Sequence, residues 1–447
     1  MSLLKVDPPK PLWPGPGAVR GSNHQGSPRG VGSSIMKAVA SPPMGVSRPV
    51  DGRPVGGRRD ARRSRRIDTR AAEVDLYPQG LAASAWFDSG SGSHPYTATI
   101  RFSGRRVGAT GRLGAGDSFV RDEIIEEIIP AAGPMSITTR VCDVNPGEWS
   151  VTAEMLHPAG TPKSTRQSTR LGARGSQYLF PAAWSWRRWA VSTGTARPVK
   201  TRWAPLTNLA RIPAVIPGSW PGLVLLGVVV GLTLQSMLIG RAHLDVGRVL
   251  ATTIVASVVG LVGAKAWYVA LNLSGWREAL RVGLCIQGFL IGALAVSLGG
   301  LFLLRLPIGQ ILDATAPALF FGVAIGRLGC FFTGCCAGRQ SASRWAIWSS
   351  DRRVGARRIP TQLLESQAAL GIGVTALLAE IYSRPAVPGT IFLASFAAYT
   401  LCRQGLLRLR GEARRSALGG PITAAVAAIV LVASLSSMYL GVPRAFL

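Results

Sequence analysis

The C-terminal half of the chain contains seven long apolar runs, which restrict its fold more than any other feature. In hydrocarbon every backbone polar group must be bonded internally, so only helices and closed barrels cross a bilayer. A spanning helix needs about 20 apolar residues, and most of the runs approach that length. The runs lie near residues 219–239, 249–272, 283–304, 311–332, 367–383, 386–403 and 420–441. We predict a mainly α-helical, polytopic membrane domain over residues 218–441, with about seven transmembrane helices.

The N-terminal region differs sharply in composition. The chain has a formal net charge of +28 although 47% of its residues are hydrophobic, so charge and hydrophobicity are segregated. Residues 1–75 are rich in Pro, Gly, Ser and Arg, cannot bury a core, and are predicted to form a disordered tail. A basic balance suits nucleic acid or an anionic lipid surface. Zinc-finger spacing and aromatic RNA-binding motifs are lacking, so we expect the lipid bilayer and no nucleic acid as partner.

A third segment, residues 80–157, has the alternating pattern of β-strands. Residues 96–102, 136–141 and 148–154 each alternate apolar and polar side chains. We predict a small β-sandwich-like domain there, followed by a basic linker over residues 158–217. The sequence of this domain does not indicate its function, so a binding or spacer module is the default interpretation.

One arginine interrupts the apolar segment 313–338. Arg327 lies between Gly326 and Gly329, and an ionisable residue at membrane depth is by default a functional-site hypothesis. The glycines allow a close approach to the guanidinium, whose planar fork suits phosphate or carboxylate. The alternative is a structural or snorkelling arginine.

Three of the six cysteines follow this arginine. Cys330, Cys335 and Cys336 could form a metal or redox cluster, or could pack as small apolar residues in a turn. Neither a fourth ligand nor a histidine lies nearby in sequence, so we favour packing and expect no metal.

The segment resembles the signature of bacterial prolipoprotein diacylglyceryl transferases. That family has a Gly-Arg-(Ile/Leu)-Gly-(Asn/Cys)-Phe core before a glycine-rich turn, matched here by residues 326–331. A second block, residues 360–365, looks like the family's Pro-(Ser/Thr)-Gln-Leu-Tyr-Glu. The resemblance covers roughly residues 220–440. The matching signature positions are Asp313, Gly326, Gly329, Cys330, Gly334 and Gly338.

The resemblance implies a reaction and a location. Members transfer the diacylglyceryl group of phosphatidylglycerol to the lipobox cysteine thiol of a prolipoprotein, in the bacterial plasma (inner) membrane. A thioether forms and glycerol phosphate leaves, without a cofactor. The partners implied are phosphatidylglycerol and prolipoprotein lipobox peptides. This chemistry needs a grip on phosphate, activation of the thiol and a cavity open to lipid.

The resemblance also implies roles for individual residues. Arg327 would hold the phosphate, with Lys265 as a further head-group contact. Arg403 and Arg410 match two catalytic arginines, and their spacing of seven predicts one helical face. The family's intervening glutamate is Leu407 here. A membrane-flanking basic cluster is the alternative interpretation of this pair.

Two departures from the family pattern bear on turnover. Gln287 stands where the family has a histidine, and glutamine cannot act as a general base near neutral pH. Pro221 replaces a tyrosine. The first hypothesis is therefore a transferase with Gln287 in the catalytic set. The second is a non-catalytic paralogue that binds phospholipid or lipoprotein precursors, and the third is a membrane-anchored adaptor.

The distribution of arginines gives conflicting topologies. Arginines crowd the tail and the loops 339–358 and 403–415, which the positive-inside rule places in the cytoplasm. The family instead keeps its signature on the outer face of the membrane. We expect the site on the outer face and leave the side of the sandwich open.

Overall fold

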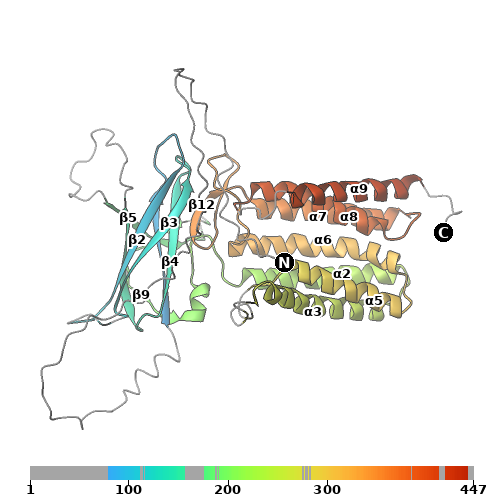
Figure 1. The fold of residues 1–447 in the computed structure, drawn as a ribbon, viewed down its shortest axis with the longest axis horizontal. Helices are drawn as coiled ribbons and strands as arrows, with labels where there is room; N and C mark the ends of the chain where they lie inside the picture. Colours follow the sequence, from blue (N-terminus) through green and yellow to red (C-terminus); the bar gives the residue numbers. More distant parts are fainter. Residues whose placement is uncertain are drawn as a thin grey trace, which may run out of the picture. The chain divides into compact units, whose positions relative to one another are not determined.

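The computed structural model describes residues 79–440, apart from gaps at 111–113, 115, 157–175, 187–188, 190, 274–275, 277–279, 281–282, 384 and 412–417 (Figure 1). All the described residues belong to one compact unit. The tail predicted over residues 1–75 lies outside them.

The C-terminal half forms the predicted helices. Six of the helices in the described residues are long and apolar enough to cross a membrane, while α8 has 17 residues. The chain is therefore a multi-pass membrane protein, which confirms the predicted fold class. The helices are α2 (Ser219–Arg241), α3 (Val246–Ala270), α5 (Ile286–Leu303), α6 (Ile308–Thr333), α7 (Thr361–Tyr382), α8 (Thr390–Leu406) and α9 (Gly419–Leu440).

Helix α6 is the most enclosed of the bundle. In the apolar stretch of α6, 44% of the residues are buried, against 11% in that of α5. It packs closely on α2, because a Cβ at Gly227 would lie 2.7 Å from the carbonyl oxygen of Gly322. Small residues permit such close helix contact where lipid offers no hydrophobic driving force. The signature therefore runs along the centre of the bundle.

Two antiparallel sheets form the N-terminal β domain. One has the order β11-β12-β4-β1-β7-β8, with β10 beside β1, and the other has the order β3-β2-β5-β6, with β9 beside β5. Their facing side chains, including Phe102, Ile125 and Met135, form the core. The strands are β1 (Gln79–Asp88), β2 (Tyr96–Arg106), β3 (Ser118–Ile128), β4 (Pro134–Cys142), β5 (Glu148–Leu156), β6 (Ser176–Tyr178), β7 (Phe180–Trp184), β8 (Val191–Thr193), β9 (Val199–Lys200), β10 (Arg202–Trp203), β11 (Ile347–Ser350) and β12 (Val354–Arg358).

The β domain extends beyond the bounds expected from the sequence. Strands β6 to β10 lie within residues 158–217, where we expected only a linker. These strands are two to five residues long, too short for a clear alternating pattern.

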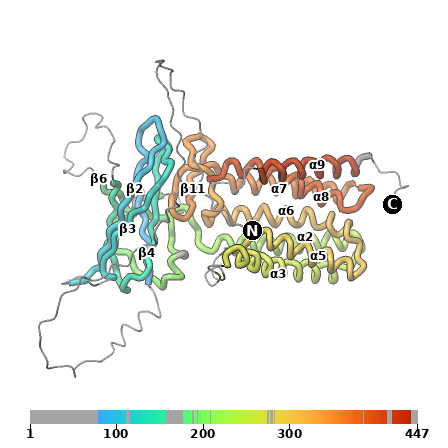
Figure 2. The backbone as a smooth tube through the Cα atoms, in the orientation of Figure 1, coloured from blue at the N-terminus to red at the C-terminus, as the bar shows by residue number. Residues whose placement is uncertain are grey.

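The hairpin of β11 and β12 comes from the loop between α6 and α7 and completes the first sheet. Val354 pairs with Ile137, and Gly355 pairs with Ser136. Val354 and Ala356 are buried in the core of the β domain. Figure 2 shows this orange hairpin beside the blue-green strands. The sandwich therefore lies on the same side of the membrane as the α6–α7 loop.

Candidate active site

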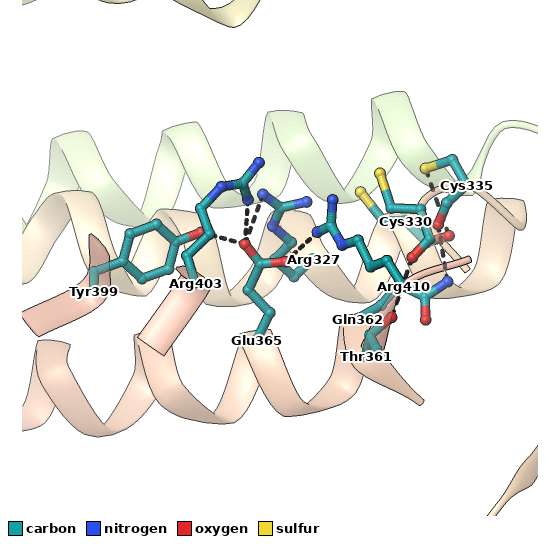
Figure 3. A network of polar contacts seen from close by, with 10 residues as sticks. Arg327, Cys330, Cys335, Thr361, Gln362, Glu365, Tyr399, Arg403 and Arg410 are labelled. Carbon is teal, nitrogen blue, oxygen red and sulfur yellow. Dashed lines mark hydrogen bonds and ion pairs between the residues drawn. The ribbon is translucent and has the colours of Figure 1, made fainter. Parts of the chain in front are cut away.

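A buried glutamate, Glu365 on the second turn of α7, is the centre of the polar network in the bundle (Figure 3). Its Oε1 pairs with Arg327 Nη2 at 2.9 Å and accepts hydrogen bonds from Arg403 Nη1 and from the Tyr399 hydroxyl at 2.8 Å. Its Oε2 accepts from Arg410 Nη2 at 2.6 Å. The three arginines singled out in the sequence thus meet on one carboxylate.

The three arginines come from two helices and a loop. Arg327 lies on α6, and Arg403 lies in the last turn of α8. The spacing of seven predicted that Arg403 and Arg410 share one helical face. They do not, because α8 ends at Leu406. A short 3₁₀ turn follows, and Arg410 is extended, with φ −81° and ψ 152°. Both guanidinium groups still reach Glu365, one from the helix and one from the loop.

The cluster carries excess positive charge. One carboxylate faces three guanidinium groups, so two positive charges are not balanced within it. The side chain of Glu365 is 1% exposed and that of Arg410 is 5%, whereas Arg403 is 30% exposed. Buried charge is costly unless it is paired. The arrangement is therefore suited to an anion that enters beside Arg403 and Arg327.

Close contacts restrict three of the four signature glycines on α6 and in the turn that follows it. Gly334 ends α6 with φ 72°, and a Cβ there would lie 2.5 Å from Ser350 O. A Cβ at Gly338 would lie 2.1 Å from Ile359 O, and one at Gly329 would lie 3.1 Å from Trp220 Cα. A Cβ at Gly326 would make only an ordinary contact, 3.8 Å from a Val224 methyl group.

The second sequence block fixes this turn. Gln362 Nε2 donates to Cys335 O at 2.8 Å, and the Thr361 hydroxyl donates to Cys336 O at 3.2 Å. The two blocks are thus one structural unit, with Glu365 one helical turn beyond the residues that bind the signature loop.

The cysteines of the turn are free thiols. Cys330 is buried on α6, while Cys335 and Cys336 are half-buried after it. Cys335 Sγ points to Cys330 O at 3.7 Å. In the described part of the chain, no three His, Cys, Asp or Glu side chains form a group that could hold a metal ion.

Asp313 lies away from the signature turn. It precedes Arg327 by 14 residues on α6, which is about 21 Å along a helix. Its Oδ2 accepts from Gly389 N at 2.6 Å, and its Oδ1 accepts from Phe392 N at 3.0 Å. It therefore caps the N-terminus of α8 from a neighbouring helix and is not part of the turn that follows α6.

Lys265 and Gln287 lie at the same end of the bundle as the cluster, since successive helices alternate in direction. Lys265 Nζ donates to Gly283 O at 3.2 Å. Gln287 is exposed at the start of α5, 3.6 Å from Cys285 Sγ. Among the described residues, no hydrogen bond or ion pair joins either side chain to Glu365 or its arginines.

Sequence reasoning did not select two residues of the cluster. Glu365 ends the second block and Tyr399 lies four residues before Arg403, yet neither was chosen. The available signal was an acidic residue in an apolar run, which needs a cationic partner at membrane depth.

The C-terminal half of the chain is similar in sequence to known proteins. A model of the family described as prolipoprotein diacylglyceryl transferase matches residues 212–440. The phosphatidylglycerol–prolipoprotein diacylglyceryl transferase of Thermosynechococcus vestitus is 28% identical over 238 residues, which cover 50% of this chain and 85% of that protein. The protein of the same name from Nostoc is 27% identical over 240 residues, covering 50% of this chain and 82% of its own.

Proposed function

Because this chain belongs to the prolipoprotein diacylglyceryl transferase family, we propose that it moves the diacylglyceryl group of phosphatidylglycerol to the lipobox cysteine thiol of prolipoproteins. The observation that supports this proposal best is the meeting of Arg327, Arg403 and Arg410 on Glu365. We further propose that the reaction takes place at the outer face of the bacterial plasma membrane.

The arginines supply a grip on phosphate. Guanidinium forks bind phosphate oxygens through charge-assisted hydrogen bonds. Glu365 orients the forks and balances one of the three charges, leaving two for a ligand. The phosphodiester of phosphatidylglycerol carries one negative charge, and the departing phosphate monoester carries up to two. The cluster therefore binds the leaving group more strongly than the substrate, which favours transfer.

The bond changes balance without a cofactor. The cysteine sulfur attacks the glycerol carbon that bears the phosphate ester, so a C–S bond forms. The C–O bond breaks, and its electrons leave with glycerol phosphate. The thiol proton needs an acceptor, which Gln287 cannot be. The departing phosphate monoester, with a second pKa of about 6, can take that proton while Gln287 orients the acceptor peptide.

The test is transfer of labelled diacylglycerol from phosphatidylglycerol to a cysteine-containing lipobox peptide, with the full-length protein in nanodiscs. Complementation of a transferase-depleted strain is the cellular counterpart. We expect thioether-linked product in the first assay and growth in the second. A protein that binds phosphatidylglycerol but neither forms the product nor restores growth would contradict the transferase proposal.

A further inference from the structure

A second group of arginines lies where the β domain meets the bundle. The turn of the β11–β12 hairpin lies against β4, because Thr138 N donates to Arg353 O at 2.8 Å. The same turn reaches the last residue of α6, because Arg352 Nε donates to Thr333 O at 2.9 Å. Arg352 is exposed to solvent and is not part of the Glu365 cluster.

Arg140 lies beside this turn, on the outer face of its sheet. The Thr139 hydroxyl donates to Glu123 of the facing sheet at 2.9 Å, while Thr138 bonds to Ser84 within its own sheet. Side chains alternate along a strand, so Arg140 points outward with Thr138. Its Nε is buried and lacks a hydrogen-bond partner among the described residues. Burial lowers the pKa of Arg140, and the nearby positive charge of Arg352 lowers it further.

The neighbouring carboxylates have other partners. Asp351 accepts from Arg358 Nη2 at 2.8 Å and from the backbone N–H groups of Arg353 and Val354. Glu123 accepts from Arg121 and Thr139 and pairs with Arg353 at 3.7 Å. Within the described residues, Arg140 and Arg352 form no ion pair with either acid. Two neighbouring cations without a counter-charge are a costly arrangement that a bound anion relieves.

The position of the pair indicates which anion can reach it. Thr333 is the last residue of α6, a helix long and apolar enough to span the membrane. The ends of such a helix lie at the level of the lipid head groups. Arg352 is therefore accessible both to phospholipid phosphates and to phosphate esters in water.

We propose that Arg140 and Arg352 form a second phosphate-binding site at the junction of the β domain and the bundle. The outer guanidinium nitrogens of Arg140 and Arg352 donate to the phosphate oxygens. The phosphate belongs to an anionic phospholipid head group or to a soluble glycerol phosphate. The site goes beyond the proposed transfer reaction and does not depend on it.

The experiment measures phosphate binding with the central cluster disabled. The full-length protein carries Arg327→Gln as background, and Arg140→Gln, Arg352→Gln or Arg140→Lys is added. Arg105→Gln is the matched control, since Arg105 is an exposed arginine of the other sheet. One arm titrates glycerol phosphate by calorimetry. The other counts phosphatidylglycerol molecules retained by the protein, using native mass spectrometry after extraction from mixed phosphatidylcholine membranes.

Loss of a charge-assisted hydrogen bond should weaken binding about tenfold or more. We expect Arg140→Gln and Arg352→Gln to cause that loss in one arm, which identifies the source of the phosphate, and Arg140→Lys to restore part of it. Because Arg352 is exposed, Arg352→Gln tests the site without disturbing the packing around Arg140.

Two results would overturn the proposal. One is that Arg140→Gln and Arg352→Gln bind as much phosphate as the Arg105→Gln control in both arms. The other is complete loss of binding in the Arg327→Gln background alone, which would assign all phosphate to the central cluster. Absence of transfer by the wild-type protein, together with junction binding in the Arg327→Gln background, would refute the proposed function and leave this site standing.

Discussion

The buried guanidinium of Arg358 donates to the carbonyl oxygen of Gly338 at 3.2 Å, linking the hairpin strand β12 to the signature turn. Gly338 also forms an antiparallel bridge with Arg410, one of the arginines on Glu365. A chain of contacts therefore runs from the sheet of the β domain to the centre of the site. The β domain is placed to hold the geometry of Arg410, because it shares its core with the strand that carries Arg358.

Arg327→Ala should abolish transfer or phosphatidylglycerol binding while the protein still inserts and folds. The loss of a charge-assisted bond to phosphate costs about 1.5–3 kcal/mol. Arg327→Lys should rescue only part of the activity, since lysine lacks the fork. The control is Arg408→Ala, which removes an exposed arginine near the cluster. Transfer unchanged in Arg327→Ala would rule out this residue as the phosphate ligand.

Glu365→Gln should destabilise the bundle. The variant has nearly the same shape but leaves Arg327, Arg403 and Arg410 without their shared counter-charge. Removing one partner of a buried ion pair costs about 3–5 kcal/mol. Thermal unfolding in detergent should show a lower Tm, and added phosphate should restore part of the loss. A Tm equal to that of the wild type would mean that Glu365 is not needed to balance the arginines.

Two truncations should differ sharply. Deletion of residues 1–75 should leave insertion and transfer intact, because none of the described site contacts uses that segment. Deletion of residues 1–203 should destabilise the α6–α7 loop, because Val354 and Ala356 lose the core in which they are buried. Limited proteolysis of the hairpin and the transfer assay report both effects. Full transfer by the longer truncation would show that the hairpin holds the signature turn unaided.

Asp313→Ala should reduce stability without changing the apparent KM for phosphatidylglycerol. Its carboxylate caps the N-terminus of α8 through two backbone N–H groups, and loss of a cap costs about 0.5–2 kcal/mol. Thermal unfolding and transfer kinetics separate the two effects. A raised KM with an unchanged Tm would return Asp313 to the binding site.

Gln287→His should raise transfer to a lipobox peptide. A neutral imidazole at this position could accept the thiol proton, and a general base typically contributes about 10²–10⁴-fold. The measurement compares transfer rates of the two proteins across neutral pH. A high wild-type rate that the variant does not improve would indicate that the leaving phosphate already serves as the acceptor.

The sequence predicted those parts of the molecule that depend on local patterns. Apolar runs near 20 residues located the helices, and the isolated charge of Arg327 located the central cluster. It did not predict the pairing of Val354 with Ile137, because contacts between residues so far apart leave no trace in local periodicity. The partner of Asp313 was missed for the same reason, since its bonds cross to another helix. Arg410 reached Glu365 although the helix that was expected to carry it ends at Leu406.

The closure of the sheet by β12 has a consequence for biogenesis. Strand β12 is synthesised about 210 residues after β4, with which it pairs. At about 5–20 residues per second, the β domain waits roughly 10–40 s for its missing strand, while four helices enter the membrane. During that interval the edge of β4 is open and resembles an aggregation-prone sheet edge. Folding of the extramembrane domain is thus timed by insertion of the bundle, and a stalled insertion would leave that domain incomplete.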